Sequence, residues 1–146
     1  MATAAIKIAQ SDAEIRSCFP VMRELRTHLE PDSFVARVRL QEREGYRLAF
    51  LEENGAVSSV AGFRYLENLA SGRVLYVDDL VTAPDRRSGG SGGKLFDWLV
   101  EQARARGCAT LELDSGVQRF GAHRFYLRRR MNISSHHFRL PLDESP

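Results

Sequence analysis

The sequence predicts an α/β protein whose elements follow one another in the order β-α-α-β-β-β-α-β-α-β. Three observations carry this prediction. The run from Ser11 to Glu14 has the capping-box pattern that starts a helix, Asn54-Gly55 is the strongest short signal for a β-hairpin, and a glycine-rich segment joins an apolar run to a helical pattern. With 146 residues, 43% of them hydrophobic and 27% charged, the chain is expected to fold as a single domain, residues 1–146.

The first half of the chain is expected to hold an edge strand, two helices and a hairpin. Alternation from Ala5 to Ile8 predicts the edge strand. The first helix begins after Ser11 and is kinked at Pro20, which has no amide proton to donate. The second helix begins at Pro31 and ends at Gly45. The hairpin strands are expected at Tyr46 to Leu51 and at Val57 to Tyr65, where Gly62 indicates a bulge.

The second half of the chain is expected to hold three strands and two helices. The strands are expected at Val74 to Thr82, Cys108 to Leu113 and Ile133 to Leu140. The helices are expected at Leu95 to Arg106 and Gly121 to Arg129. No apolar run is long enough to span a membrane. The two cysteines make a poor disulfide framework, so a cytoplasmic protein is expected.

The segment between the strand ending at Thr82 and the next helix has the chemistry of a phosphate-binding loop. Its four glycines let the backbone approach a ligand closely, because no Cβ stands in the way. The first amides of the helix point outward without intrahelical partners and carry the positive end of the helix dipole. The residues expected to bind are Arg86, Arg87, Ser88, Gly89, Gly90, Ser91, Gly92, Gly93 and Lys94.

Two nucleotide-binding templates fail on this segment. In the P-loop template the first glycine position holds Ser88, and Leu95 replaces the magnesium-binding hydroxyl. The dinucleotide fingerprint, counted from Gly90 and Gly92, meets Leu95 where the third glycine is needed. The spacing that fits is Arg87-x-x-Gly90-x-Gly92.

This spacing resembles the acyl-CoA pyrophosphate loop of the GNAT acetyltransferase superfamily. The resemblance covers nearly the whole chain and departs from the family at Ser91, where the loop usually has an aliphatic residue. It implies the GNAT fold, a mixed, mostly antiparallel sheet of six to seven strands with helices on both faces, and acetyl-CoA as the cosubstrate. It also implies that the pantetheine arm pairs with the backbone of Leu80, Val81 and Thr82, where two strands splay apart.

The resemblance also indicates two catalytic side chains. Tyr126, in the Phe125-Tyr126 pair, matches the position of the general acid that protonates the leaving thiolate, and a tyrosine with its ordinary pKa of about 10 holds its proton at neutral pH. Asp78 lies in an acidic stretch similar to that of small-amine acetyltransferases, and it is expected to receive or relay the amine proton. Asp79 is then expected to face the other side of the strand. The alternatives are that both acids pair with nearby arginines and that Tyr126 is a core-edge tyrosine.

The remaining reactive side chains are expected to be structural. A role as a base is the alternative for His136 and His137, one of which is expected to face the covered side of the sheet. No metal site is expected, because adjacent histidines on a strand point apart. Neither Cys18 nor Cys108 has the features of a nucleophile, so a covalent acyl-enzyme is not expected.

These features predict an N-acetyltransferase that moves an acetyl group from acetyl-CoA to a primary amine of a small molecule, by direct attack in a ternary complex. Acetylation of a protein amino terminus or lysine stays open as an alternative, and so does a CoA-binding regulatory module without turnover. The net charge is only +2, and the arginines near the C-terminus suit an anionic cofactor better than nucleic acid. Neither a nucleic-acid nor a membrane partner is expected, and a homodimer is left open.

Overall fold

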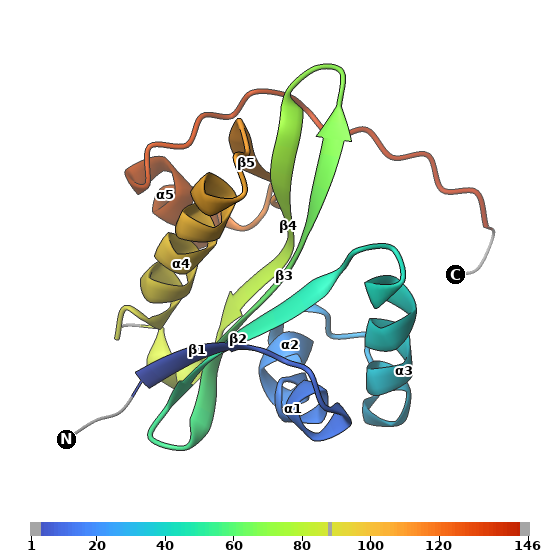
Figure 1. Ribbon diagram of the computed structural model, residues 1–146, viewed down its shortest axis with the longest axis vertical. Coiled ribbons are helices and arrows are strands. Elements are labelled where there is room, and N and C mark those ends of the chain that lie inside the picture. Colours follow the sequence, from blue (N-terminus) through green and yellow to red (C-terminus); the bar gives the residue numbers. More distant parts are fainter. Residues whose placement is uncertain (1–3, 88, 144–146) are drawn as a thin grey trace. The chain divides into compact units, whose positions relative to one another are not determined.

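The computed structural model of the chain describes residues 4–87 and 89–143, which form two compact units, Met1–Leu113 and Asp114–Pro146 (Figure 1). The first unit holds β1 (Ala4–Ile8), α1 (Asp12–Ser17), α2 (Phe19–Leu25), α3 (Pro31–Glu42), β2 (Arg47–Glu53), β3 (Ala56–Asn68), β4 (Gly72–Thr82), the 3₁₀ turn Pro84–Arg86, α4 (Ser91–Ala105) and β5 (Thr110–Leu113). The second unit holds α5 (Phe120–Arg128).

The strands form one sheet in the order β1-β2-β3-β4-β5. Neighbours from β1 to β4 pair antiparallel, whereas β4 and β5 run parallel because α4 connects them. The prediction of a mixed, mostly antiparallel sheet is confirmed. The described residues form a sheet of five strands rather than the six to seven expected.

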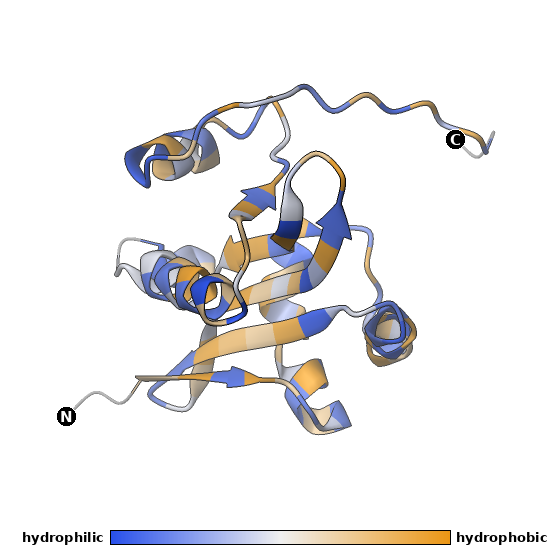
Figure 2. Cartoon of the chain, turned by 45° about the horizontal axis from the view of Figure 1, so that its top comes forward, coloured by the Kyte–Doolittle hydropathy of each residue, from blue (hydrophilic) through white to orange (hydrophobic). Residues whose placement is uncertain are grey.

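Helices cover both faces of this sheet, as predicted (Figure 1). Successive strand residues point to opposite faces, so Leu48 and Phe50 enter one core and Ala49 enters the other. The first core packs against α1, α2 and α3, and the second packs against α4 through Leu95 and Leu99. Figure 2 shows apolar residues along the strands and on the helices beside them.

Two local sequence signals are confirmed. Asn54 and Gly55 have φ angles of 53° and 80° and close the hairpin between β2 and β3. Ser11 Oγ accepts a hydrogen bond from the Glu14 amide at 3.1 Å, and Glu14 Oε1 accepts one from the Ser11 amide at 3.1 Å. This reciprocal pair is the capping box that the sequence predicts at the start of α1.

The first predicted helix is in fact two helices. α1 ends at Ser17 and α2 begins at Phe19, with Pro20 in the first turn of α2. Proline is tolerated in a first turn because the amide proton that it lacks would have no partner there. Pro20 therefore marks the start of a helix rather than a kink within one.

The last predicted strand, Ile133 to Leu140, is wrong: these residues take part in no sheet pairing within the described part of the chain. A strand needs a neighbour for its backbone hydrogen bonds, and a pattern of apolar side chains does not supply one. Ile133 and Phe138, which suggested the strand, are 75% and 91% exposed.

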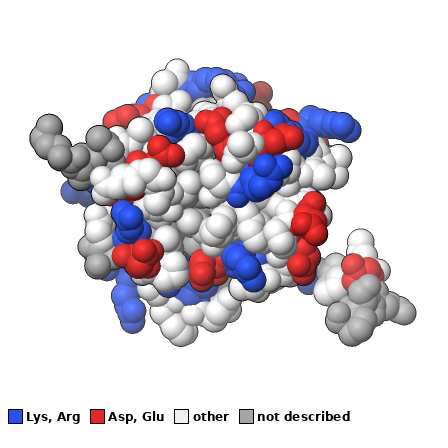
Figure 3. Space-filling view, turned by 90° about the horizontal axis from the view of Figure 1, so that it is seen from below, with Lys and Arg blue, Asp and Glu red and all other residues white. Residues whose placement is uncertain are grey.

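Charges of both signs are interspersed on one face of the protein (Figure 3). The face drawn in Figure 3 carries lysine and arginine beside aspartate and glutamate, without a large patch of one sign. Among the described residues, no helix is long and apolar enough to cross a membrane.

Candidate active site

The glycine-rich loop joins β4 to α4. Gly90 has a φ of +79°, a conformation that residues with a side chain rarely adopt, and it turns the chain into α4 at Ser91. The Lys94 amide donates to the Gly90 carbonyl at 3.1 Å and closes the first turn, so the amides of residues 91–93 have no partner within the helix. α4 begins before the predicted Leu95 because the glycines of its first turn lower the helix propensity of the sequence there.

Gly92 brings this first turn against the end of β4. A Cβ at this position would lie 2.8 Å from Thr82 Oγ1, closer than real Cβ atoms come to other heavy atoms. Thr82 Oγ1 lies in turn 3.4 Å from the hydroxyl of Ser59, which is completely buried. The absence of a side chain at Gly92 therefore sets how closely the first turn of α4 approaches the sheet.

The predicted cofactor-binding residues that the structure describes gather at this junction. Arg87 Nε donates to the Thr82 carbonyl at 3.3 Å, and Lys94 is exposed. Ser88 lies outside the described residues. The others are Leu80, Val81 and Thr82 at the end of β4, Arg86 in the 3₁₀ turn, Gly89 and Gly90 before α4, and Ser91, Gly92 and Gly93 in its first turn.

Among the described residues of the first unit, the end of β4 next to this loop has one strand partner, β3. β5 pairs with β4 only as far as Val77, so the rest of β4 pairs with β3 alone. The amide of Ala83 donates to β3 at 2.8 Å, and the hydrogen-bonding direction alternates along an antiparallel pair. The backbone groups of Leu80 and Thr82 therefore point away from β3, and those of Val81 point toward it. The pairing of Leu80 and Thr82 with a pantetheine arm stays a prediction.

A β-bulge positions the two acids of β4. The register between β3 and β4 shifts between Gly62 and Phe63, so Asp78 is the extra residue on β4, and the bulge that Gly62 indicates is confirmed. The bulge also interrupts the alternation of side chains. The prediction that Asp78 and Asp79 face opposite sides of the strand is therefore wrong. Both side chains join one cluster around the ring of Tyr46.

Asp78 forms a two-point ion pair with Arg64 of β3. Arg64 Nε donates to Asp78 Oδ1 at 3.0 Å, and Arg64 Nη2 donates to Asp78 Oδ2 at 2.8 Å. Burial raises the pKa of Asp78, while the charge and hydrogen bonds of Arg64 oppose that shift. The carboxylate is therefore both a partner of an arginine and a group that takes up a proton more readily than an ordinary aspartate.

Asp79 is held by two donors from other elements. Arg26, just after α2, donates through Nε to Asp79 Oδ1 at 2.8 Å and through Nη2 to the Asp78 carbonyl at 2.8 Å. The Tyr46 hydroxyl donates to Asp79 Oδ2 at 2.8 Å, and burial, reinforced by the charge of Asp79, raises the pKa of Tyr46. The guanidinium of Arg64 lies 5.6 Å from the centre of the same ring.

The sequence gives no signal for Arg26, Tyr46 and Arg64. Arg26 follows α2, Tyr46 precedes β2 and Arg64 lies in β3, with no motif spacing between them. The alternative that both acids pair with arginines describes the contacts correctly, whereas the sequence could not name the partners.

Tyr126 lies on α5 in the second unit. It is half-buried, and burial raises its pKa, with the positive charge of Arg119 opposing the shift. The Phe125 and Tyr126 rings lie 5.5 Å apart, edge to face. With a raised pKa the phenol keeps its proton at neutral pH, as a proton donor must.

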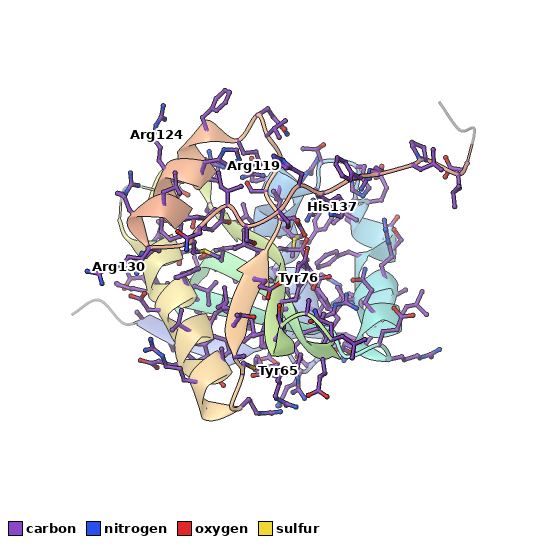
Figure 4. All side chains as sticks on the ribbon, turned by 90° about the horizontal axis from the view of Figure 1, so that it is seen from above. Tyr65, Tyr76, Arg119, Arg124, Arg130 and His137 are labelled. Carbon is purple, nitrogen blue, oxygen red and sulfur yellow. The ribbon has the colours of Figure 1, made fainter. Side chains whose placement is uncertain are left out.

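The other predicted polar groups of the second unit are close to the surface. His136 and His137 are both exposed, so the prediction that one of them faces a covered side of the sheet is wrong, because the segment is not a strand. His137 Nδ1 lies 3.7 Å from Asp114 Oδ1. Figure 4 shows Arg124 projecting outward from α5.

The cysteines have no marks of a nucleophile. Cys18 is buried, and burial raises the pKa of its thiol to about 12, so almost none of it is the reactive thiolate at neutral pH. Cys108 is partly buried, and no disulfide joins the two. No three His, Cys, Asp or Glu side chains among the described residues are arranged to hold a metal ion.

Comparisons with known proteins assign the family. A model of the Acetyltransferase (GNAT) family matches residues 11–131. The chain is 35% identical over 139 residues to the uncharacterized N-acetyltransferase YhdJ of Bacillus subtilis (strain 168), covering 94% of this chain and 98% of that protein. It is 32% identical over 123 residues to the aminoalkylphosphonate N-acetyltransferase of Salmonella typhimurium (strain LT2), covering 84% of this chain and 77% of that protein.

Solved structures share the fold. An aminoglycoside N-acetyltransferase, AAC(6')-Iy in complex with CoA, has a TM-score of 0.82 at 10% identity, covering 99% of this chain and 97% of that one. At that identity the likeness concerns the fold alone. The chain therefore has the GNAT fold, and the family match and the two relatives show that it belongs to the GNAT acetyltransferase family. Members of the GNAT family are acetyltransferases that use acetyl-CoA.

Replacing Gly92 by alanine is expected to weaken CoA binding about tenfold, because the new methyl group pushes the first turn of α4 away from Thr82. Isothermal titration with CoA measures this change. Gly121→Ala is the control, because a Cβ there would meet nothing within 4 Å and Gly121 is not among the residues expected to bind the cofactor, so it should cost little affinity. Equal losses for the two variants would contradict the role given to the close approach at Gly92.

Proposed function

We propose that this chain transfers the acetyl group of acetyl-CoA to a primary amine of a small molecule, by direct attack of the amine on the thioester in a ternary complex. The observation that carries the proposal is the junction of β4 and α4. There, free helix amides, close-packed glycines and exposed basic side chains face the part of β4 that β5 leaves unpaired. We also propose that residues 1–146 act as one acetyltransferase domain, which the family match across both units supports.

In this proposal the donor is held by the loop and by β4. The amides from Gly90 to Gly93 bind the pyrophosphate, with the side chains of Arg86, Arg87 and Lys94 matching its charge. The backbone of Leu80 and Thr82 pairs with the pantetheine arm. This leaves the thioester beside the bulge at Asp78.

The chemical step needs one proton acceptor and one proton donor. The amine nitrogen attacks the acetyl carbon, the carbon–sulfur bond breaks, and the amine gives up a proton. Asp78 receives or relays that proton, and Tyr126 protonates the departing thiolate. The raised pKa values of both groups support these roles, because Asp78 accepts a proton more readily than usual and Tyr126 arrives protonated.

The acceptor is proposed to be a small amine on two grounds. The acids at the bulge favour a cationic group, and a relative at 32% identity is named for the acetylation of aminoalkylphosphonates. Arg64 and Arg26 lie beside the same acids, so an acceptor that carries both an amine and an anion finds both charges matched there.

The experiment is thiol release from acetyl-CoA with a panel of aminoalkylphosphonates, polyamines, aminoglycosides, amino acids and peptides, with products identified by mass. The proposal expects acetylation of at least one small amine in preference to the peptides. Preference for a peptide amino terminus or lysine would favour the protein-acetylating alternative. Binding of acetyl-CoA without turnover on any acceptor would favour a regulatory module.

Replacing Asp78 by asparagine is expected to lower kcat/KM for the amine about a hundredfold, because the variant can neither attract nor deprotonate the ammonium group. CoA affinity should stay within about twofold of the wild type, since the loop is untouched. Steady-state kinetics with both substrates varied measures the two effects separately.

Asp79→Asn is the control for this variant. It disturbs the hydrogen bonds that Tyr46 and Arg26 donate to Asp79. We therefore expect it to lower the free energy of unfolding by about 1–3 kcal/mol and to change kcat/KM little. If Asp78→Asn likewise lost only stability and kept kcat/KM, the acids would both be structural partners of arginines.

A further inference from the structure

Ser91, the position at which this chain departs from the usual loop pattern, is tied to a distant carboxylate. Its side chain opens α4 and is 2% exposed. Ser91 Oγ donates a hydrogen bond to Oε1 of Glu53, the last residue of β2. An aliphatic residue at this position could not make the bond.

Glu53 is itself held in place by Ser58 of β3. Ser58 Oγ lies 2.8 Å from Glu53 Oε1 and 3.2 Å from the Leu51 carbonyl, and it is 1% exposed. The register between β2 and β3 shifts between Leu51 and Glu52, which leaves Ser58 as the extra residue of a bulge. The bulge thus places a buried hydroxyl beside the carboxylate that reaches Ser91.

The charge of Glu53 suits this role. Hydrogen bonds from Ser91 and then Ser58 lower its pKa, with smaller contributions from the positive charges of Lys94 and Arg86. The side chain is therefore an ionised acceptor at neutral pH, and hydrogen bonds to an ionised acceptor are stronger than those between neutral groups. Such a bond fixes Ser91 more firmly than packing of a small hydroxyl alone.

We infer that Glu53 is a positioning residue of the donor site: with Ser58 it anchors Ser91 and thereby sets the first-turn amides of α4 that receive the pyrophosphate. The inference rests on the proposed function for its last step, the pyrophosphate. The anchoring of the first turn stands on the contacts themselves and applies to the protein without a ligand.

Four variants distinguish the effect of the hydrogen bond between Ser91 and Glu53 from the effect of the charge of Glu53 and from a general loss of stability. Ser91→Ala removes the bond and keeps the carboxylate, whereas Glu53→Ala removes both. Glu53→Gln keeps an oxygen acceptor and removes the charge. Glu52→Ala is the matched control, because it removes the same charge at the adjacent residue, whose partner is Lys7 at 3.8 Å.

The first readout is amide hydrogen exchange of residues 94–97 in the full chain without ligand, because Lys94 carries the amide whose hydrogen bond to Gly90 closes the first turn of α4. Ser91→Ala and Glu53→Ala are expected to speed exchange there about tenfold relative to the rest of α4, because each variant loses one charge-assisted hydrogen bond. Glu53→Gln should fall between these variants and the wild type, and Glu52→Ala should match the wild type. Equal exchange in Ser91→Ala and Glu52→Ala would overturn the anchor.

The second readout is the Kd of CoA by calorimetry, together with steady-state kinetics. Ser91→Ala and Glu53→Ala are expected to raise the Kd and the KM for acetyl-CoA about tenfold, with kcat and the KM for the amine unchanged. An equal fall in kcat in both, or an unchanged Kd, would overturn the positioning role. If the wild type did not bind CoA, the proposed function would fail, while the exchange data would still decide whether the anchor exists.

Discussion

Replacing Tyr126 by phenylalanine is expected to lower kcat about a hundredfold, the usual range for loss of a general acid, and to leave CoA affinity within about twofold. The hydroxyl that is lost is the proposed proton donor to the thiolate, while the phenyl ring that packs edge to face with Phe125 is kept. Single-turnover and steady-state measurements with a responsive amine from the panel give both quantities.

Tyr65→Phe is the matched control. Burial raises the pKa of Tyr65 as it does that of Tyr126, but its ring lies on β3 with Arg106 4.8 Å and Arg73 5.6 Å from its centre. Loss of this hydroxyl is expected to leave kcat unchanged. Weaker CoA binding with normal kcat in Tyr126→Phe would show that the phenol is a binding group and not an acid.

Replacing Gly62 by alanine is expected to destabilise the protein by about 3 kcal/mol, the upper range for overpacking a core. A Cβ at this position would overlap the phenol ring of Tyr46, which is 4% exposed and held by its hydrogen bond to Asp79. Neither strand can move away without disturbing the bulge at Asp78. Chemical denaturation measures the change in the free energy of unfolding.

A double-mutant cycle isolates the cause. Tyr46→Ala is destabilising by itself, but Gly62→Ala on that background is expected to cost less than about 1 kcal/mol, because the overlap is gone. Gly121→Ala, where a Cβ would meet nothing within 4 Å, is expected to be neutral or stabilising in α5. The same cost for Gly62→Ala with and without Tyr46 would contradict the steric account.

The parts of the fold that the sequence predicts are those set by local chemistry. The capping box at Ser11 and the hairpin at Asn54-Gly55 depend on residues a few positions apart, and both form as expected. The apolar spacing of α4 correctly predicts the face of the helix that packs on the core, through Leu95 and Leu99. Each of these signals is complete within a short window of the chain.

The predictions that fail depend on partners that a short window does not contain. The segment from Ile133 to Leu140 has the side chains of a strand, but pairing needs a second backbone, and none pairs with it in the described residues. Pro20 is read as a kink because the same residue can interrupt a helix or start one.

In the candidate site, too, the features set by neighbouring residues are predicted from the sequence, and those set by distant partners are not. The glycine spacing, a local property, predicts the loop, and the structure adds why Gly90 and Gly92 must be glycine. The bulge puts Asp78 and Asp79 in one cluster, and no strand pattern reveals an extra residue in the register. Glu53 was missed because its partner Ser91 lies 38 residues further along the chain.

The most direct test of the central claim, that the junction of β4 and α4 holds acetyl-CoA, is the thermal unfolding of the chain with and without this ligand. We predict that acetyl-CoA at about a hundred times its Kd raises the midpoint by several degrees, which corresponds to about 2.7 kcal/mol of linked stabilisation, while ATP and NAD at equal concentration do not. No shift at saturating acetyl-CoA, or an equal shift with ATP or NAD, would contradict the assignment.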